Sequence, residues 1–381
     1  MKSQLRGLMA LAAILMVFWP VEPVPAAGRY DVVKPDESQS VPTHSTYGLR
    51  IAPRLDYSLR DLQFVTPLVG YAMGTGLRRG QAPVVYKTRD GGKSWLVRPI
   101  ECGWNPRAIA FADEKRGLVT VSAPIGCPDA CQYLTAALLT SDGGETWSEV
   151  RYLEFQGAIV DVIFNHEGTA FGMLFHMMHP GGDTWPEYHL TLLRSDDVGR
   201  SWSRIHELPR PGFDGFGRFP LRYHQDRLYI PWADASIKVF DTDGRLLETV
   251  ETGYYMLWDL VIVSESTIFA TAINLDGTQH LIRTVDAGRT WEIVYEGAAK
   301  VAFARSSDDF GIIVNRGHMG YHQRSLDVIA HTTDGGTTWR ESEPVLSLGS
   351  NIRRRVHHPS VERDLLLLGS RVVEIDHFDR E

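Results

Sequence analysis

The sequence predicts an all-β protein built from repeated, stacked units of strands, and two observations predict it. First, an eight-residue segment, Thr88 to Trp95, returns four more times. The later copies are Thr140 to Trp147, Ser195 to Trp202, Thr284 to Trp291 and Thr332 to Trp339. Second, similar strand-length apolar segments surround each copy. A repeat at intervals of roughly 50 residues is typical of supersecondary units that stack on one another.

Each copy, called a repeat turn below, reads Ser or Thr, any residue, Asp, any residue, Gly, any residue, Ser or Thr, Trp. The Asp can accept hydrogen bonds from backbone N–H groups of its own turn. The Gly can take a positive φ at little steric cost, and the Trp can pack as an apolar lid over the sheet edge. The aspartates and tryptophans are Asp90, Asp142, Asp197, Asp286 and Asp334, and Trp95, Trp147, Trp202, Trp291 and Trp339. Because the turn already uses each Asp, we expect a structural role for this row rather than acid/base catalysis.

The repeat turns resemble the Asp-box, or bacterial neuraminidase, repeat, a hairpin turn of β-propeller blades. This resemblance implies a single β-propeller, for which we count seven four-stranded blades. The long gap between Asp197 and Asp286 should hide a blade whose turn has lost its Trp, and Val239 to Gly244 supplies that turn. Only three strand-like segments follow Trp339. We therefore expect Tyr47 to Pro53 to complete the last blade, which closes the ring and leaves no open sheet edge.

The strands of the ring are expected in chain order. Blade one should hold a strand from Ser58, then Gly70 to Gly74, Val84 to Thr88 and a strand from Ser94. The first three strands of blade two should be Pro106 to Phe111, Gly117 to Ser122 and Leu134 to Thr140, and those of blade three Val160 to Phe164, Gly168 to Phe175 and Leu190 to Ser195. Blade five should run from about Met256 to Val294 and blade six from about Lys300 to Trp339. The last blade should hold Arg353 to His357, Leu365 to Gly369 and Val372 to Phe378.

The N-terminal residues 1–27 read as a secretory signal peptide. Lys2 and Arg6 precede an apolar run, and small residues stand at a cleavage position before Gly28, which is the usual order of such signals. A retained N-terminal anchor is the alternative. Residues 28–46 should form a linker or a wrapping segment, and residues 47–381 the propeller.

Composition fits a turn-rich globular protein and limits the partners. The chain is 43% hydrophobic and 23% charged, with 35 Gly and 20 Pro. Its formal net charge is −8, and loss of residues 1–27 would make it one unit more negative. That charge argues against nucleic acid and anionic membranes as direct partners. We expect a secreted or periplasmic monomer whose partner is a protein or a glycan.

Three cysteines follow the N-terminal apolar run. Export makes a disulfide reasonable, and Cys127 and Cys131 flank a short loop, so we expect these two to pair and Cys102 to stay reduced. Three cysteines at this spacing make a poor zinc site. We expect no cofactor and no metal centre.

Over residues 58–340 the sequence of the repeated segments also resembles the repeats of the photosystem II stability/assembly factor family. The matching segments are Leu59 to Phe64, Gly70 to Ala72, and the first repeat turn. That family is a non-enzymatic scaffold that assists membrane-protein assembly. The resemblance therefore implies a binding or assembly role, with any membrane contact made through the partner.

A second family with this repeat, the exo-sialidases, implies a glycoside hydrolase as the alternative. Those enzymes need three arginines on the substrate carboxylate, a Tyr nucleophile paired with Glu, and an Asp acid/base. Arg50-Ile51-Ala52-Pro53 only loosely resembles that family's opening Arg-Ile-Pro signature, with one extra residue. No Tyr with an evident Glu partner is apparent in the sequence. The departure puts sialidase activity in doubt.

Charged residues also recur at one position of the innermost strands. Asp61, Asp161 and Asp259 occupy it in blades one, three and five, with Lys300 and Arg354 in blades six and seven. Innermost strands line the central channel, so this column could form a charged ring. The stronger interpretation is structural, because an Asp there belongs to the blade consensus.

The loops between second and third strands lie opposite the repeat turns, and this side is called the long-loop face. Long, uneven loops on a rigid scaffold are typical of binding sites, and Met and aromatic groups give adaptable contact area. His and Met together also suit copper in an exported protein, which keeps a metal-binding protein as a third alternative. The candidate binding residues are His176, Met178, His179 and Trp185 in blade three, Arg316, His318, Tyr321 and His322 in blade six, and Arg354, which belongs to a basic run.

Overall fold

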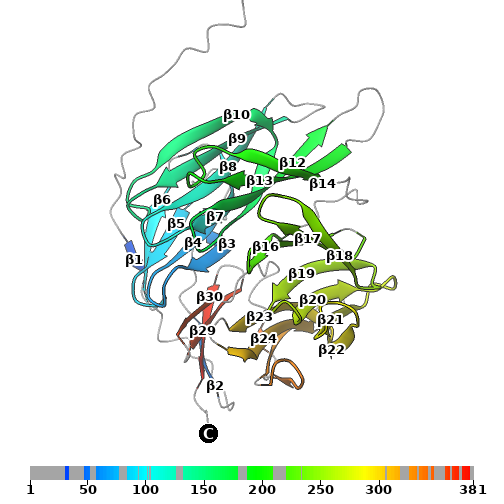
Figure 1. Cartoon of the computed structure of the whole chain (residues 1–381). Coiled ribbons are helices and arrows are strands. Elements are labelled where there is room, and N and C mark those ends of the chain that lie inside the picture. The colour runs from blue at the N-terminus through cyan, green and yellow to red at the C-terminus, as the bar shows by residue number, and fades with distance from the viewer. Residues whose placement is uncertain are drawn as a thin grey trace, which may run out of the picture.

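The chain folds as a single all-β β-propeller, in which the sheets follow one another around a common centre in the order of the sequence (Figure 1). The computed structural model describes residues 31–33, 47–51, 57–76, 84–92, 94–100, 102, 104–125, 132–178, 187–208, 220–232, 234–304, 307–317, 326–332, 334–341, 345–346, 357–360, 363–368 and 371–377.

Every sheet is antiparallel, and most follow the same meander from an inner to an outer strand. Blade one contains β3 (Tyr57–Phe64), β4 (Gly70–Gly76), β5 (Val84–Thr88) and β6 (Trp95–Pro99), and blade two contains β7 (Asn105–Phe111), β8 (Gly117–Ile125), β9 (Gln132–Thr140) and β10 (Ser148–Gln156). Blade three contains β11 (Ala158–Phe164), β12 (Ala170–Met178), β13 (Glu187–Ser195) and β14 (Ser203–Leu208). Blade four contains β15 (Arg222–His224), β16 (Arg227–Pro231), β17 (Ser236–Asp241) and β18 (Leu246–Glu251), and blade five contains β19 (Met256–Ile262), β20 (Ile268–Ile273), β21 (Gln279–Thr284) and β22 (Glu292–Glu296).

Two further sheets are described mainly by their backbone pairing. One contains β23 (Ala298–Ala304), β24 (Ser307–Gly317), β25 (Leu326–Thr332) and β26 (Arg340–Glu341), with β27 (Val345–Leu346) also paired to β25. The other has the order β2 (Tyr47–Ile51), β30 (Arg371–His377), β29 (Arg363–Leu368) and β28 (His357–Ser360). Its first strand, β28, lies beside β3 of blade one.

The blade count from the sequence needs correction. Seven blades are expected, whereas the structure shows five, each of which packs its side chains on at least one neighbouring blade. The side chains of the last two sheets fall largely outside the described residues. The blade inferred in the long gap is present as blade four. Its turn keeps the Asp chemistry: the Asp241 carboxylate accepts hydrogen bonds from the backbone N–H groups of Asp243 and Arg245 at 3.1 and 2.8 Å.

The N-terminal segments pair with two different sheets. β2 runs antiparallel to β30 from Tyr47 opposite His377 to Ile51 opposite Val373. β1 (Asp31–Val33), which falls in the segment expected to be a linker or a wrapping segment, adds to the outer edge of β6.

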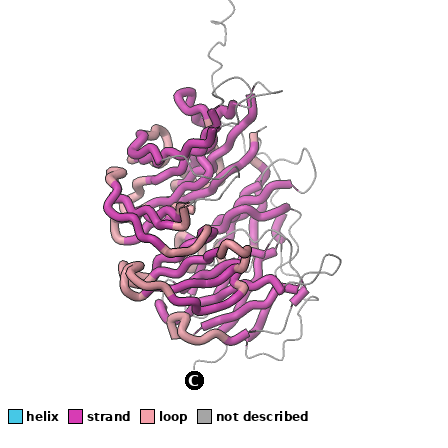
Figure 2. Tube along the Cα trace, turned by 90° about the vertical axis from the view of Figure 1, so that its right-hand side faces the viewer, coloured by secondary structure: helices cyan, strands magenta, loops and turns pink. Residues whose placement is uncertain are grey.

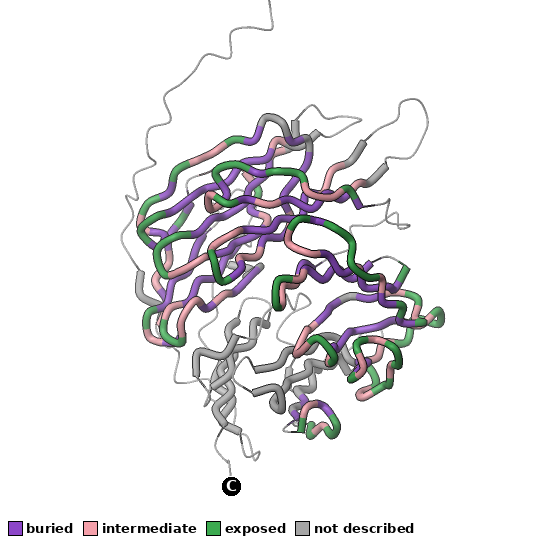
Figure 3. The backbone as a smooth tube through the Cα atoms, in the orientation of Figure 1, coloured by how far each residue is buried: buried purple, intermediate pink, exposed green. Residues whose placement is uncertain are grey.

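The core consists of apolar layers between successive blades. Tyr71 of blade one and Ile109 of blade two belong to one such layer, and Val162 of blade three packs with Leu118 of blade two in the next. Equivalent layers join blades three and four, and four and five. In Figure 3, the buried residues follow the middle strands and the exposed ones follow the outer strands and turns. This burial holds each blade on its neighbours and makes a rigid frame.

The described turns gather along one side of the molecule (Figure 2). They include the repeat turns and the links between first and second strands, which emerge at the same end of each blade. The strand ends that lead into the long second-to-third-strand loops point the other way. Among the described residues there is no helix long and apolar enough to cross a membrane.

Candidate functional site

The five repeat turns share one hydrogen-bond pattern. In the first, the Thr88 hydroxyl donates to the Asp90 carboxylate at 2.8 Å and accepts from the Gly92 N–H at 2.8 Å. The backbone N–H and the hydroxyl of Ser94 donate to the two oxygens of the same carboxylate at 2.9 and 2.5 Å. The other four turns repeat these contacts. Each Asp is therefore used within its own turn, as the sequence predicts.

These bonds favour the ionised form of each Asp. The backbone N–H and hydroxyl of Thr290 lower the pKa of Asp286 to about 2, and the equivalent groups of Thr338 lower the pKa of Asp334 to about 2. In Asp90, burial raises the pKa, but the combined hydrogen bonds from Ser94 and Thr88 outweigh it and lower the pKa overall. A carboxylate held in this way is a poor proton donor at neutral pH, which argues against acid/base work.

The repeat turns also touch the preceding blade. Gly199 and Gly288 have φ of 85° and 87°, and a Cβ at either would overlap Leu118 or Val250 of the blade before. The closing Trp covers the turn: the Trp95 indole N–H donates to the Gly92 carbonyl at 3.0 Å, and its ring meets Phe64 edge to face. These residues are structural parts of the frame.

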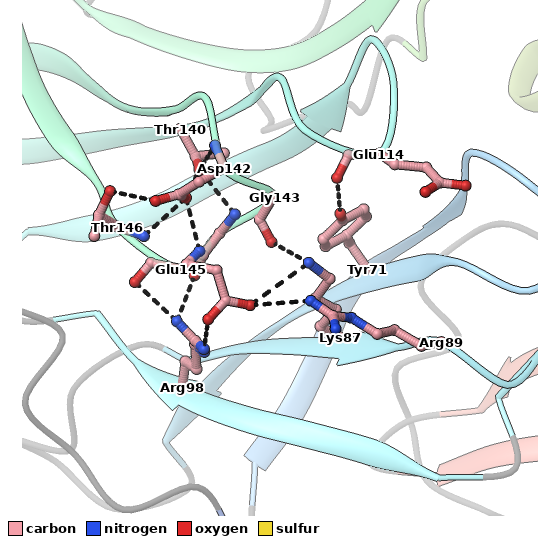
Figure 4. A network of polar contacts seen from close by, with 11 residues as sticks. Tyr71, Lys87, Arg89, Arg98, Glu114, Thr140, Asp142, Gly143, Glu145 and Thr146 are labelled. Atoms are coloured by element: carbon pink, nitrogen blue, oxygen red, sulfur yellow. Dashed lines mark hydrogen bonds and ion pairs between the residues drawn. The ribbon is translucent and has the colours of Figure 1, made fainter.

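Polar contacts hold blade one to the turn of blade two (Figure 4). Lys87 donates to the Gly143 carbonyl at 2.7 Å, and Arg98 donates to the Glu145 carbonyl at 2.8 Å. The Glu145 carboxylate pairs with Arg98, with Lys87 at 3.7 Å and with Arg89 at 3.4 Å. Burial, followed by the charge of Arg89, lowers the pKa of Lys87. The network satisfies two cations that would otherwise be buried without partners.

The same kind of contact recurs at other seams. Lys87 directly precedes the first Ser/Thr of a repeat turn, and so do Arg194 and Arg283. Arg194 donates to the Asp243 carboxylate at 2.7 Å in blade four, and Arg283 donates to the Gly335 carbonyl at 2.9 Å in the sheet after blade five. A cation at this position thus joins three blades to the turn that follows.

The inner column of aspartates is buried and bonded to backbone. Each lies just after a bulge in the innermost strand and accepts the N–H of the next residue: Leu62 for Asp61, Val162 for Asp161 and Leu260 for Asp259. Asp161 also accepts the Leu221 N–H of blade four at 3.0 Å, and Asp259 pairs with Arg222 of blade four at 2.6 Å. These contacts favour the structural interpretation of the column over a charged ring for ligands. The side chains of Lys300 and Arg354 lie outside the described residues.

The long-loop face is only partly described. His176, Met178 and Arg316 lie at strand ends that lead onto this face, but only the His176 side chain is described. The other six candidates, His179, Trp185, His318, Tyr321, His322 and Arg354, lie outside the described residues. The structure therefore places three of the nine candidates at the base of the predicted loops and leaves the others as predictions.

A histidine pair marks the base of the blade-three loop. His176 of β12 lies opposite His189 of β13, with ring centroids 5.2 Å apart. Burial, followed by the charge of His189, lowers the pKa of His176. The two imidazoles carry nitrogen atoms that can form hydrogen bonds, and they lie at the strand ends that lead to the segment carrying Trp185. Sequence analysis missed His189, although the hairpin register starting from Ala170 opposite Ser195 would have found it.

One tyrosine bears on the hydrolase alternative. The Tyr223 hydroxyl donates to the Asp226 carboxylate at 2.6 Å and lies 3.4 Å from the His166 ring. Burial, followed by the bond to Asp226, raises the pKa of Tyr223 to about 12. A tyrosine nucleophile needs the opposite change in its pKa. This residue also lies on the side of the repeat turns, not on the long-loop face.

The predictions on metal binding and on the cysteines fall partly on described residues. Within the described ranges, no group of three or more His, Cys, Asp and Glu side chains is arranged to hold a metal ion. Cys102 is a free thiol, and burial raises its pKa. Cys127 and Cys131 lie outside the described residues, so their pairing stays a prediction.

Comparison with known proteins supports the fold more strongly than any activity. No protein-family model matches the chain. A curated xyloglucanase from a Paenibacillus species is 27% identical over 209 residues, which cover 52% of this chain and 19% of that protein. The chain thus spans less than a fifth of the length of this relative.

Several solved structures have the same architecture. YCF48 bound to a D1 peptide superposes with a TM-score of 0.60 at 15% identity, over 91% of this chain and 100% of that one. A GH74 xyloglucanase from Xanthomonas campestris superposes with a TM-score of 0.56 at 14% identity, over 85% of this chain and 52% of that one. An ulvan lyase of polysaccharide lyase family PL25 superposes with a TM-score of 0.52 at 11% identity, over 87% of this chain and 96% of that one. At these identities the likeness shows the β-propeller fold alone.

Proposed function

We propose that this chain is a non-catalytic β-propeller scaffold that binds a polypeptide or glycan partner on its long-loop face. The observation that carries the proposal is the use of the repeated carboxylates. The turn aspartates accept two hydroxyl donors and at least one backbone N–H donor each, and the inner aspartates hold strand bulges and seams. The repeated aspartates therefore stabilise the rigid propeller. Binding is then expected at the loops that the propeller holds in place.

The His176 and His189 pair supports this choice of face. Both side chains are half-buried at the ends of β12 and β13 that lead to the segment carrying Trp185, where a partner would complete their desolvation. Polar groups at the base of a pocket fix orientation, while aromatic side chains around them supply contact area. Trp185 and Tyr321 provide those aromatic groups in the two longest candidate loops.

The proposal also covers the type of repeat, the number of blades, the closure of the ring and the export of the chain. The repeat turns are Asp boxes, the two further sheets act as the sixth and seventh blades, and β2 closes the ring as the outer strand of the last. Residues 1–27 direct export, and the mature chain is a secreted or periplasmic monomer. Among structural relatives, YCF48 is known with a bound peptide, which supports a polypeptide partner before a glycan.

A paired substitution tests the binding face. We expect Trp185→Ala with Tyr321→Ala to abolish co-purification of a stoichiometric partner from the native envelope, because aromatic anchors contribute ~2 kcal/mol or more at interface hot spots. The thermal midpoint should not change. Leu247→Ala is the matched control, since Leu247 is an exposed apolar residue on β18 away from this face, and it should retain the partner. Retention of the partner by the double variant would overturn the long-loop assignment.

A glycoside hydrolase is the second candidate function, favoured by the 27% identity to a xyloglucanase over 209 residues. The purified chain should be incubated with xyloglucan and with a fluorogenic sialoside, and the release of reducing ends or fluorophore measured. Turnover above that of a heat-inactivated sample would replace the scaffold by the enzyme. The scaffold predicts no release from either substrate.

A further inference from the structure

Exposed charged side chains on the outer strands of blades two to five discourage another strand from pairing with their free edges. Each exposes at least one charged side chain: Arg151 on β10, Arg204 and Glu207 on β14, Glu248 and Glu251 on β18, and Glu292 and Glu296 on β22. Exposed charges on an edge strand discourage another chain from adding to it, because pairing would desolvate them. These four edges are therefore closed to strand addition.

The outer strand of blade one lacks this protection. β6 reads Trp-Leu-Val-Arg-Pro, and its one charged side chain, Arg98, is turned inward and paired with Glu145. Leu96 and Val97 are half-buried, and only Pro99 is exposed. Pro99 has no N–H and so marks one end of the available edge. Between Trp95 and Arg98, the outer edge of β6 therefore has no exposed charge that would oppose the addition of another strand.

The chain itself covers this edge. β1 pairs antiparallel with β6, with Asp31 opposite Val97, Val32 opposite Leu96 and Val33 opposite Trp95. Blade one thereby gains a fifth strand from residues that precede the propeller in sequence. Within the described part of the chain the cover consists of the three residues of β1, and three residues form few backbone hydrogen bonds.

We propose that the outer edge of β6 is a strand-accepting site, held closed by β1, which takes an extended segment of a partner polypeptide when β1 leaves. The partner's main chain would supply the ladder of hydrogen bonds, and small β-branched residues opposite Trp95 and Leu96 would fit where valines stand now. Adding a strand to a sheet edge gives affinity through the backbone and selectivity through alternate side chains. This surface is separate from the long-loop face and goes beyond the proposed function.

Because β1 belongs to the same chain as β6, it competes strongly with a free peptide for the edge of β6. β1 is joined through the chain to the blade that it covers, and a binding segment tethered in this way can reach an effective concentration of order millimolar. A free peptide with the same sequence would therefore bind the intact chain only in the fraction of molecules whose edge is open, and its apparent Kd is raised in proportion. Breaking the pairing of β1 should remove that competition.

Fluorescence anisotropy with a labelled peptide copying residues 28–36 tests the proposal. We expect it to bind the Val32→Pro protein at least about tenfold more tightly than the unaltered chain, because proline removes a backbone donor from β1. The Val32→Ala protein, which keeps that donor, should behave like the unaltered chain. The same peptide carrying Val32→Pro should bind none of the three proteins.

Hydrogen exchange supplies the second readout. Amides of β6 should exchange faster in the Val32→Pro protein, and the unsubstituted peptide should restore their protection. Equal peptide affinity for the unaltered and Val32→Pro proteins would overturn the proposal, and so would binding of the proline-containing peptide. Concentration-dependent dimers of the unaltered chain that exchange β1 would also overturn it, since β1 would then cover a second copy. These outcomes are independent of Trp185 and Tyr321, which test the long-loop face.

Discussion

Replacement of Glu145 by alanine should loosen the seam between blades one and two. Its carboxylate neutralises Lys87 and Arg98, whose side chains are 7% and 10% exposed, while the carboxylate itself is 34% exposed. Without it, two buried cations keep their carbonyl acceptors but lose their counter-charge. Glu145→Ala therefore removes one partner from a mostly desolvated network, the case in which the cost of an ion-pair deletion is largest.

The loss in free energy of unfolding expected for Glu145→Ala lies between two limits. Removing one partner of a fully buried ion pair costs about 3 to 5 kcal/mol, and exposed pairs are typically worth about 1 kcal/mol or less. Because Glu145 is one-third exposed, solvent screens part of the effect, and we expect a loss of about 2 kcal/mol. For a domain this large, a loss of about 2 kcal/mol corresponds to a fall in thermal midpoint of roughly 3 °C.

Thermal denaturation followed by circular dichroism measures this change. Glu207→Ala is the matched control, because Glu207 pairs with Arg204 at 3.9 Å on the surface, with 77% and 45% of the two side chains exposed. Its midpoint should stay within about 1 °C of the unaltered chain. Combining Glu145→Ala with Arg98→Ala should cost less than the sum of the single changes, since both remove the same interaction. An equal midpoint for the Glu145 and Glu207 variants would refute the role assigned to the network.

Three further predictions concern the turns and the ring. Val198→Gly should stabilise the chain by about 0.5 to 1 kcal/mol in urea denaturation, because a β-branched residue at φ 60° is strained; a lower urea midpoint would contradict this. The pKa values of Asp286 and Asp334, about 2, lie below the ordinary 3.8, so their stabilisation is present above pH ~4 and lost as the pH falls toward 2. The thermal midpoint of an Asp334→Asn variant should accordingly change less over that pH range than that of the unaltered chain. Deletion of residues 28–55 should lower the thermal midpoint of the whole ring, because it removes β2 from its pairing with β30; an unchanged midpoint would rule out closure by this strand.

The sequence predicted those parts of the fold that repeat. Local chemistry determines a repeat turn, since Asp90 bonds only to groups within four residues of itself. The turn then sets the hairpin register on both sides. Even the altered turn at Asp241 could be located, because its carboxylate and the positive φ of Gly244 survive without the Trp.

Contacts between blades could not be predicted in the same way. Glu145 belongs to one turn and serves cations from the blade before, a relation that no local spacing encodes. The addition of β1 to β6 also depends on tertiary placement, because three residues of a polar segment carry too little periodicity to indicate a strand. The segments bearing Trp185 and Tyr321 contain no sequence repeat, so their residue types suggest binding without fixing its geometry.

The contacts made by the cations that precede the repeat turns all run in the same direction around the ring. Lys87, Arg194 and Arg283 each extend forward, from one blade to the turn of the next along the chain. As the polypeptide emerges during synthesis, a newly formed blade carries a donor whose acceptor has not yet been made. Each of these three blades therefore reaches its full stability only once its successor has folded, and a chain interrupted directly after one of them leaves that cation without its acceptor. In such an unfinished chain, the blade before the break would lose stability, because its cation has no acceptor.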